Sequence, residues 1–193
     1  MTDARIVRTR AALNRAIIDL ATEKAVPSIT VSELAAEAGI NRVTFYKHFT
    51  TPAEALGAAL TLDLDETRKR FIDGHGSHEG DPIEFFRDSV NEVLDHIDRH
   101  RSLYELSVHS PQDGTVPNLL ADHFTETITQ YLETRARLDP PLPDVDRSIV
   151  SRFFAHGLVG AIKAWLLSGS SDRDEVLRSV MVIGPDWWLP ERP

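Results

Sequence analysis

Residues 30–49, TVSELAAEAGINRVTFYKHF, have the pattern of two short helices joined by a tight turn. Thr30 and Glu33 have the spacing of a capping box, in which a hydroxyl and a carboxylate satisfy free backbone N–H groups at a helix start. Gly39 follows an apolar stripe of helical period, at a point where a left-handed residue can end the first helix. Asn41 is a good N-cap for the second helix. The stretch therefore predicts a helix-turn-helix, which presents a recognition helix to the major groove of DNA.

The second helix, expected over residues 42–49, has a polar side suited to nucleic acid, because its donors match phosphate oxygens and base edges. We expect Ile40, Val43 and Phe49 to point inward. The residues expected to contact DNA are Arg42, Thr44, Tyr46, Lys47 and His48, with Thr30 and Ser32 at the start of the first helix and Arg5 or Arg8 on a flanking phosphate. The alternative interpretation is a solvated helical hairpin within a larger bundle.

The segment TVSELAAEAGINRVTFYKHFTTPAEAL resembles the DNA-binding domain of the TetR family of bacterial transcriptional regulators, and TFYKHF is its most specific part. The resemblance covers roughly the first 60 residues. It implies an all-α fold with an N-terminal three-helix helix-turn-helix DNA-binding domain and a C-terminal helical ligand-binding and dimerisation domain. We place the domains at residues 1–50 and 51–193, with a fourth helix over residues 52–72 as linker. Pro52 stands where the family usually has a lysine, which removes one expected phosphate contact.

Composition and charge fit a chain with one DNA-binding end. The 193 residues carry a formal net charge of -9, yet residues 1–50 hold seven basic and five acidic residues. DNA binding is therefore expected at that end only, with few phosphate contacts per subunit. The chain has no cysteine, no apolar core of a signal peptide near its start, and no apolar run of the ~18 to 20 residues that cross a bilayer. A cytoplasmic protein with no membrane partner is expected.

Apolar residues recur at helical spacing in most of the remaining chain, and no strand alternation is visible. Helices are expected over residues 3–23, 52–72, 82–100, 103–108, 119–137, 147–168 and 172–183. Turn-rich breaks are expected over residues 73–81, 110–118 and 139–144. The tail PDWWLPERP is expected either to cover an apolar patch or to fray.

The helix expected over residues 147–168 has small or apolar residues nearly all round, so it must be buried. Its small residues, which we expect at a dimer interface, are Ala155, Gly157, Gly160, Ala161 and Ala164. The resemblance implies a dimer formed by the last two long helices, and a two-fold dimer would read a palindromic operator. The alternative is an internal core helix with glycines for close packing.

The resemblance also implies a pocket among the middle helices for a small-molecule effector. Candidate ligand-binding residues are Phe85, Phe86, Leu103, Tyr104, His109, His123, Phe124, Phe153, His156 and Trp165. Their aromatic character favours an apolar or aromatic ligand, and the alternative for each of them is a core residue or a satisfied or exposed histidine. No cofactor is expected.

Other kinds of site have weak signals. His96 and His100 are four residues apart, a spacing compatible with zinc or nickel, but the run DHIDRHR fits a solvated helix end. We therefore expect no metal. No Gly-rich phosphate loop, GxSxG elbow or HExxH motif occurs, so no catalytic residue is assigned.

The sequence predicts a ligand-responsive homodimeric repressor. An all-α small-molecule enzyme, and a protein–protein adaptor whose hairpin does not bind DNA, remain as alternatives.

Overall fold

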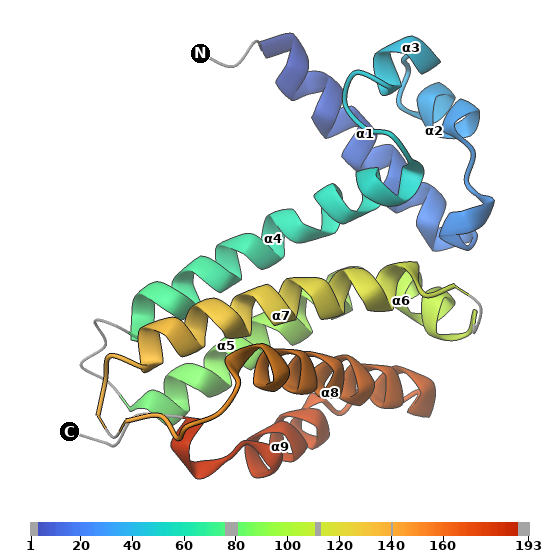
Figure 1. The fold of residues 1–193 in the computed structure, drawn as a ribbon. Helices are drawn as coiled ribbons and strands as arrows, with labels where there is room; N and C mark the ends of the chain where they lie inside the picture. The colour runs from blue at the N-terminus through green and yellow to red at the C-terminus, as the bar shows by residue number, and fades with distance from the viewer. Residues whose placement is uncertain (1–3, 76–80, 111–112, 140, 189–193) are drawn as a thin grey trace. The chain divides into compact units, whose positions relative to one another are not determined.

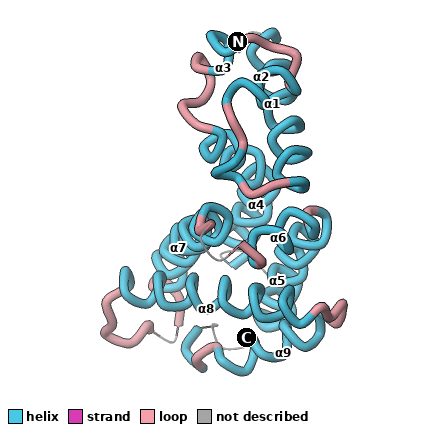
Figure 2. The backbone as a smooth tube through the Cα atoms, turned by 90° about the vertical axis from the view of Figure 1, so that its right-hand side faces the viewer, coloured by secondary structure: helices cyan, strands magenta, loops and turns pink. Residues whose placement is uncertain are grey.

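The computed structural model describes residues 4–75, 81–110, 113–139 and 141–188, which form helices and no strand (Figure 1; Figure 2). The helices are α1 (Ala4–Glu23), α2 (Val31–Glu37), α3 (Arg42–Phe45), α4 (Pro52–His75), α5 (Pro82–Arg99), α6 (Arg101–Val108), α7 (Thr115–Arg135), α8 (Arg147–Ser168) and α9 (Arg173–Ile183). Short 3-10 turns lie at Val26–Ser28 and Asp186–Trp188. The all-α fold class is confirmed.

Three helices differ from the predicted bounds by three residues or more. α4 continues to His75, three residues into the expected break. α7 begins at Thr115 rather than residue 119, because the Asp113 carboxylate accepts a hydrogen bond from the Thr115 N–H at 3.0 Å, which supports an earlier helix start. α3 ends at Phe45 instead of residue 49, since the backbone then closes into tighter turns, with the His48 N–H donating to the Phe45 carbonyl at 2.8 Å.

The described residues form two compact units, and each unit is made of two separate stretches of the chain. One unit comprises Met1–Leu62 with His100–Pro117, and the other comprises Asp63–Arg99 with Asn118–Pro193, apart from the residues outside the described ranges. α4 contributes its first half to one unit and its second half to the other. In this division the start of α4 and all of α6 belong to the same unit as α1 and α2, and α6 contacts α1. The functional boundary after residue 50 stays a prediction.

The first unit has a small closed core. Leu13 and Ile17 of α1, Leu34 of α2, Phe45 of α3 and Leu56 of α4 are fully inaccessible to solvent. α1 contacts both α2 and α6. These contacts bury one face of each short helix, and this tertiary packing stabilises helices too short to persist alone.

The start of α2 carries the capping box that its sequence predicts. The Thr30 hydroxyl accepts from the Glu33 N–H at 3.2 Å, and the Glu33 carboxylate accepts from the Thr30 N–H at 3.0 Å. The Lys24 ammonium lies 2.5 Å from the same carboxylate. Hydrogen bonds lower the pKa of the Glu33 carboxylate to about 2, and the largest contribution comes from Lys24 and the next from Thr30.

We expect Glu33→Gln to lower the melting temperature at pH 7, with a difference from wild type that shrinks in acid. The folded-state pKa is depressed, so the stabilisation is fully present above the ordinary value of 4.5 and is lost as pH falls toward 2. Thermal unfolding followed by circular dichroism between pH 7 and pH 3 measures this difference. Glu37→Gln, an exposed acid on the same helix, is the control, and a difference that stays constant with pH would contradict the assignment.

The second unit contains α5, α7, α8, α9 and the second half of α4. Arg173, at the start of α9, pairs with Asp95 of α5 at 2.7 Å, and Arg70 of α4 pairs with Glu92 of α5 at 2.7 Å. α8 has the bounds that its sequence predicts. Asp146 caps its first turn, with its carboxylate 2.9 Å from the Ser148 N–H.

The chain after α9 folds back over an apolar patch, one of the two outcomes expected for the tail. Trp188 is buried against Phe86, Tyr131 and Phe154, and the Tyr131 hydroxyl donates to the Trp188 carbonyl. Burial raises the pKa of Tyr131, so that the hydroxyl remains a donor. The rest of the tail lies outside the described residues.

Candidate nucleic-acid interface and internal cavity

The turn between α2 and α3 sets the direction of the recognition segment, which we define as residues 42–48. Gly39 has φ of +66°, the left-handed conformation that its position predicts. The Asn41 side chain then accepts from the Thr44 N–H at 2.8 Å and caps α3. Phe45 is fully buried, and Arg42, Tyr46 and Lys47 are exposed. The first unit thus presents cationic and phenolic side chains from a short, well-anchored segment.

Val43 does not point inward as expected, because 69% of its surface is exposed. Phe45 and Phe49 are four residues apart and share the buried side of the segment, while Val43 and Tyr46 are three apart and share the exposed side. Ile40 is half-buried. The exposed side therefore combines an apolar group with hydrogen-bond donors.

The other predicted DNA contacts have different surroundings. Thr44 and His48 are half-buried, and Ser32, Arg5 and Arg8 are exposed. The Thr30 hydroxyl is engaged in the capping box, and the Arg8 Nε donates to the Ala4 carbonyl at 3.3 Å. Contact of these residues with DNA remains a prediction.

One contact missed by the sequence reasoning anchors the end of the segment. The Arg10 guanidinium lies 5.5 Å from the centre of the Phe49 ring, in a cation–π contact between α1 and the residues after α3.

The first turn of α4 begins four residues after the end of the recognition segment. Pro52 is its first residue, and the Thr51 hydroxyl accepts from the Glu54 N–H at 3.1 Å. The Glu54 carboxylate accepts from the Thr50 N–H at 2.6 Å. Hydrogen bonds from Thr50 lower the pKa of Glu54. The helix start predicted around Pro52 is therefore formed without a lysine.

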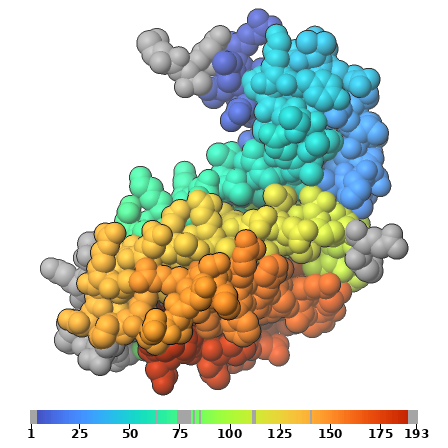
Figure 3. Space-filling model, in the orientation of Figure 1, coloured from blue at the N-terminus to red at the C-terminus, as the bar shows by residue number. Residues whose placement is uncertain are grey.

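α8 and α9 lie side by side (Figure 3). Both helices expose apolar side chains. We call this surface the α8/α9 face. Its large apolar residues, between 49% and 83% exposed, are Ile149, Phe153, Leu167, Val182 and Ile183. At Gly157 and Gly160 no atom beyond the local backbone lies within 4 Å of the place where a Cβ would stand. The glycines are therefore not explained by close packing within the chain.

The five small residues of α8 do not share one surface. Gly157, Gly160 and Ala164 are exposed on the α8/α9 face, whereas Ala155 is fully buried and Ala161 is half-buried beside a cavity. The reason is the helical period of 3.6 residues, which places Ala155 nearly opposite Ala164. Ala155 is thus a core residue of this subunit.

The sequence predicts no apolar run long enough to cross a bilayer, and α8 is the helix to compare with this prediction. It is long and apolar enough to cross a bilayer by length and composition, the one such helix in the described ranges. The sequence prediction concerned an uninterrupted apolar run, and Arg152 and Lys163 interrupt α8, so this helix meets the criterion only through the mean hydropathy that its Ile, Val, Leu, Phe and Ala residues supply. Those criteria alone are weak grounds for a span, and Arg152, His156 and Lys163 are exposed along the helix.

The second unit contains a partly open cavity of about 220 Å³ with an almost entirely apolar wall. Its wall comes from α4, α5, α7, α8, α9 and the segment after α9. Of the predicted ligand-binding residues, those that line it are Phe86, His123, Phe124 and Phe153. Phe153 is also exposed on the α8/α9 face, so the cavity reaches the surface there.

The remaining ligand-binding candidates lie elsewhere. Leu103 and Tyr104 are buried in the first unit, where α6 packs on α1. His109 and His156 are exposed, and Trp165 is buried but does not line the cavity. The side chain of Phe85 lies outside the described residues. Aromatic character alone therefore did not separate wall residues from core and surface residues.

Several wall residues were not expected. They are Leu64 and Phe71 of α4, Val90 and Val93 of α5, Ile128 of α7, and Trp188. The signal available for Val90 and Val93 was their place on the apolar stripe of α5. Nothing in the pattern distinguished the part of that stripe that borders a cavity from the part that packs tightly.

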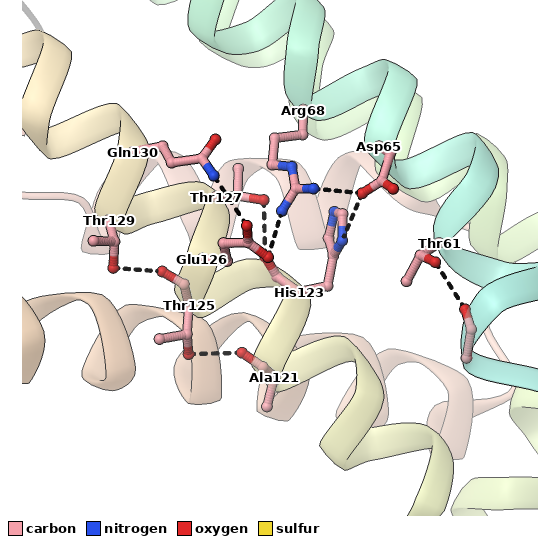
Figure 4. A network of polar contacts seen from close by, with 11 residues as sticks. Thr61, Asp65, Arg68, Ala121, His123, Thr125, Glu126, Thr127, Thr129 and Gln130 are labelled. Carbon is pink, nitrogen blue, oxygen red and sulfur yellow. Dashed lines mark hydrogen bonds and ion pairs between the residues drawn. The ribbon is translucent and has the colours of Figure 1, made fainter. Parts of the chain in front are cut away.

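A polar cluster borders the cavity where α4 meets α7 (Figure 4). Arg68 pairs with Asp65 at 2.6 Å and with Glu126 at 2.8 Å, the latter as an ion pair outside hydrogen-bond geometry. The His123 Nδ1 lies 3.6 Å from Asp65. Burial, followed by the charge of Arg68, lowers the pKa of His123, so its ring is neutral at pH 7.

The two histidines weighed as a metal site differ in their surroundings. His96 is buried within α5 rather than exposed at a solvated end, and His100 follows the end of that helix. In the parts of the chain that the structure describes, no group of three or more His, Asp or Glu side chains is placed to hold a metal ion.

Comparison with known proteins gives matches at both ends of the chain. Residues 14–56 match the family described as "Bacterial regulatory proteins, tetR family", and residues 86–181 match "Transcriptional regulator C-terminal region". An uncharacterised HTH-type transcriptional regulator, YxbF of Bacillus subtilis, is 24% identical over 176 residues. That alignment covers 91% of this chain but 44% of the relative, so the chain spans less than half of its length.

Solved structures share the fold across both units. FadR of Thermus thermophilus, a TetR-family repressor in complex with lauroyl-CoA, has a TM-score of 0.66 at 17% identity, covering 90% of this chain and 92% of that one. NalD of Pseudomonas aeruginosa, the secondary repressor of the MexAB-OprM multidrug efflux pump, has a TM-score of 0.57 at 22% identity, covering 90% and 96%. At these identities the likeness shows the fold alone.

Proposed function

This chain belongs to the TetR family of bacterial transcriptional regulators, and from that membership we propose a homodimeric, effector-responsive repressor that binds a palindromic operator in the cytoplasm. It is a DNA-binding regulator of transcription and not an enzyme. The observation that carries the proposal is the exposed side of the recognition segment, where Arg42, Tyr46 and Lys47 project from a segment anchored by the buried Phe45.

The α8/α9 face supports the homodimer. Exposed Phe153 and Leu167 flank the open glycines, and a glycine in an exposed helix interior costs about 1 kcal/mol relative to alanine. A second copy of the face would use the space above Gly157 and Gly160 for close helix packing. Two-fold symmetry would then place the recognition segments about one DNA turn apart, or a multiple of it, on a palindrome.

The cavity supports a small apolar effector. Leu64 and Phe71 line it, and Leu56 and Leu60, earlier in the same helix α4, are buried in the DNA-binding unit. An effector that binds one position of α4 better than another would shift the population of DNA-binding conformers. A bound acyl-CoA in the Thermus thermophilus FadR structure is a precedent for an effector in this fold.

Selection of operators from random DNA with the full-length protein tests the proposal. A palindromic motif should be enriched, since each subunit of the dimer reads one half-site. An adaptor whose hairpin does not bind DNA would enrich no motif, and that outcome would reject the proposal.

Val43 is expected to set one base preference within that motif. An exposed aliphatic group beside Tyr46 can contact the methyl group of a thymine in the major groove. Val43→Ala should therefore relax the preference at one position of each half-site by about 1 kcal/mol, roughly fivefold. Parallel selections with wild type, Val43→Ala and the control Val145→Ala measure this, and an unchanged motif for Val43→Ala would contradict the contact.

A further inference from the structure

The charged side chains at the cavity wall are already engaged with the protein. Arg68 and His123 are the wall residues in the described ranges whose side chains can carry a charge. Arg68 is held by Asp65 and Glu126, and the neutral His123 ring lies beside Asp65. The Thr127 hydroxyl donates to the His123 carbonyl at 2.8 Å. The indole Nε1–H of Trp188, another wall residue, is a buried neutral donor without a hydrogen-bond partner among the described residues, and most of the remaining wall is apolar.

The charge balance of this cluster is unfavourable for an anion. One guanidinium faces two carboxylates and a neutral imidazole, which leaves one net negative charge beside the cavity. A ligand carboxylate would have to displace Asp65 or Glu126 from Arg68, or else be buried without a cationic partner, which is costly even beside the neutral Trp188 N–H. A ligand ammonium gains little, because Asp65 and Glu126 do not line the cavity and are already paired with Arg68.

We propose that this cavity binds a neutral, largely hydrocarbon ligand and discriminates against carboxylates such as free fatty acids. The inference rests on the proposed function, in that it takes the cavity to be the effector site. An apolar cavity of ~150 Å³ holds benzene, so a space of about 220 Å³ fits a ligand of about nine non-hydrogen atoms. The ligand that this cavity is proposed to bind is an alcohol, ester or hydrocarbon of that size rather than an acid.

Three eight-carbon probes that differ in their head group test the inference. Isothermal titration calorimetry of the full-length protein at pH 7.5 would compare 1-octanol, octanoate and octylammonium. We expect 1-octanol to bind about tenfold or more tightly than either ion. Octanoate or octylammonium binding as tightly as 1-octanol would overturn the proposal.

A substitution in the cluster tests the physical reason. Glu126→Gln leaves Arg68 with one acidic partner, so octanoate should bind a few-fold more tightly while 1-octanol binding stays constant. The gain is modest because the Glu126 side chain is 60% exposed and its charge is screened by solvent. Glu133→Gln, an exposed acid two turns further along α7, is the matched control and should change neither affinity. Unchanged octanoate binding in Glu126→Gln would contradict the charge argument.

Variants that fill the cavity, together with the three probes, distinguish a failure of this inference from a failure of the proposed effector site. Val93→Phe should abolish 1-octanol binding, and Ala161→Leu serves the same purpose if circular dichroism shows that the first variant is unfolded. If none of the three probes binds wild type, the effector site fails and this inference fails with it. Binding in the reverse order of head groups rejects the inference and leaves the effector site standing.

Discussion

Replacing Tyr46 or Lys47 by alanine should weaken operator binding about 10- to 100-fold while the dimer survives. Both side chains are exposed on the recognition segment, so truncation removes contacts to DNA without opening the core. A good contact to a base edge is worth about 1–3 kcal/mol, and about 1.4 kcal/mol corresponds to a tenfold change. The effect is large because basic residues outnumber acidic residues by only two in residues 1–50, so few other contacts can compensate for the lost one.

Fluorescence anisotropy with a labelled operator at several salt concentrations measures this loss. If Lys47 binds a phosphate, its variant should also reduce the salt dependence of log K by about one unit. Lys69→Ala, an exposed lysine on α4, is the matched control and should bind as wild type does. Wild-type affinity in both Tyr46→Ala and Lys47→Ala would remove the recognition segment from the proposed interface.

Gly160→Arg should yield a folded monomer with operator affinity reduced by about 10³-fold or more. The position is exposed with open space around it, so the arginine is tolerated within a subunit. In a dimer it would stand where a second α8 approaches closely, and its charge would be buried without a partner. A monomer reads one half-site and loses most of the specific binding free energy.

Light scattering after size-exclusion chromatography gives the mass of the variant, and anisotropy gives its operator affinity. Ser148→Arg places the same side chain near the start of α8 and away from the α8/α9 face, and it should remain dimeric. A Gly160→Arg protein that stays dimeric would move the interface elsewhere. A monomer with full affinity would show that DNA binding does not need the dimer.

The parts of the fold that local chemistry determines were predictable from the sequence. The capping box of Thr30 and Glu33, the left-handed Gly39 and the bounds of α8 follow from short-range spacing, and all three are present. Val43 was assigned to the wrong side because residues 43, 45, 46 and 49 are all apolar or aromatic. Because α3 has only four residues, their spacing is compatible with a buried side formed by residues 43 and 46 as well as with one formed by residues 45 and 49.

The cavity could be predicted as a feature of the fold but not residue by residue. Whether Tyr104 or Phe71 faces it depends on how helices distant in sequence pack, which periodicity within one helix does not encode. The ion pairs of Arg68 had no sequence signal beyond the i,i+3 spacing from Asp65, because Glu126 lies on another helix. Trp188 reaches the wall through a turn after α9, where no helical period applies.

The packing of α6 against α1 decides where this chain can be divided. Leu103 and Tyr104 are buried in the same unit as α1, and the Asp113 carboxylate accepts from the Val26 N–H at 3.2 Å. A chimeric regulator that joins residues 1–50 to the effector part of another protein would leave these groups behind. Such a graft exposes apolar surface on α1 unless residues 100–117 travel with it or the recipient supplies an equivalent helix.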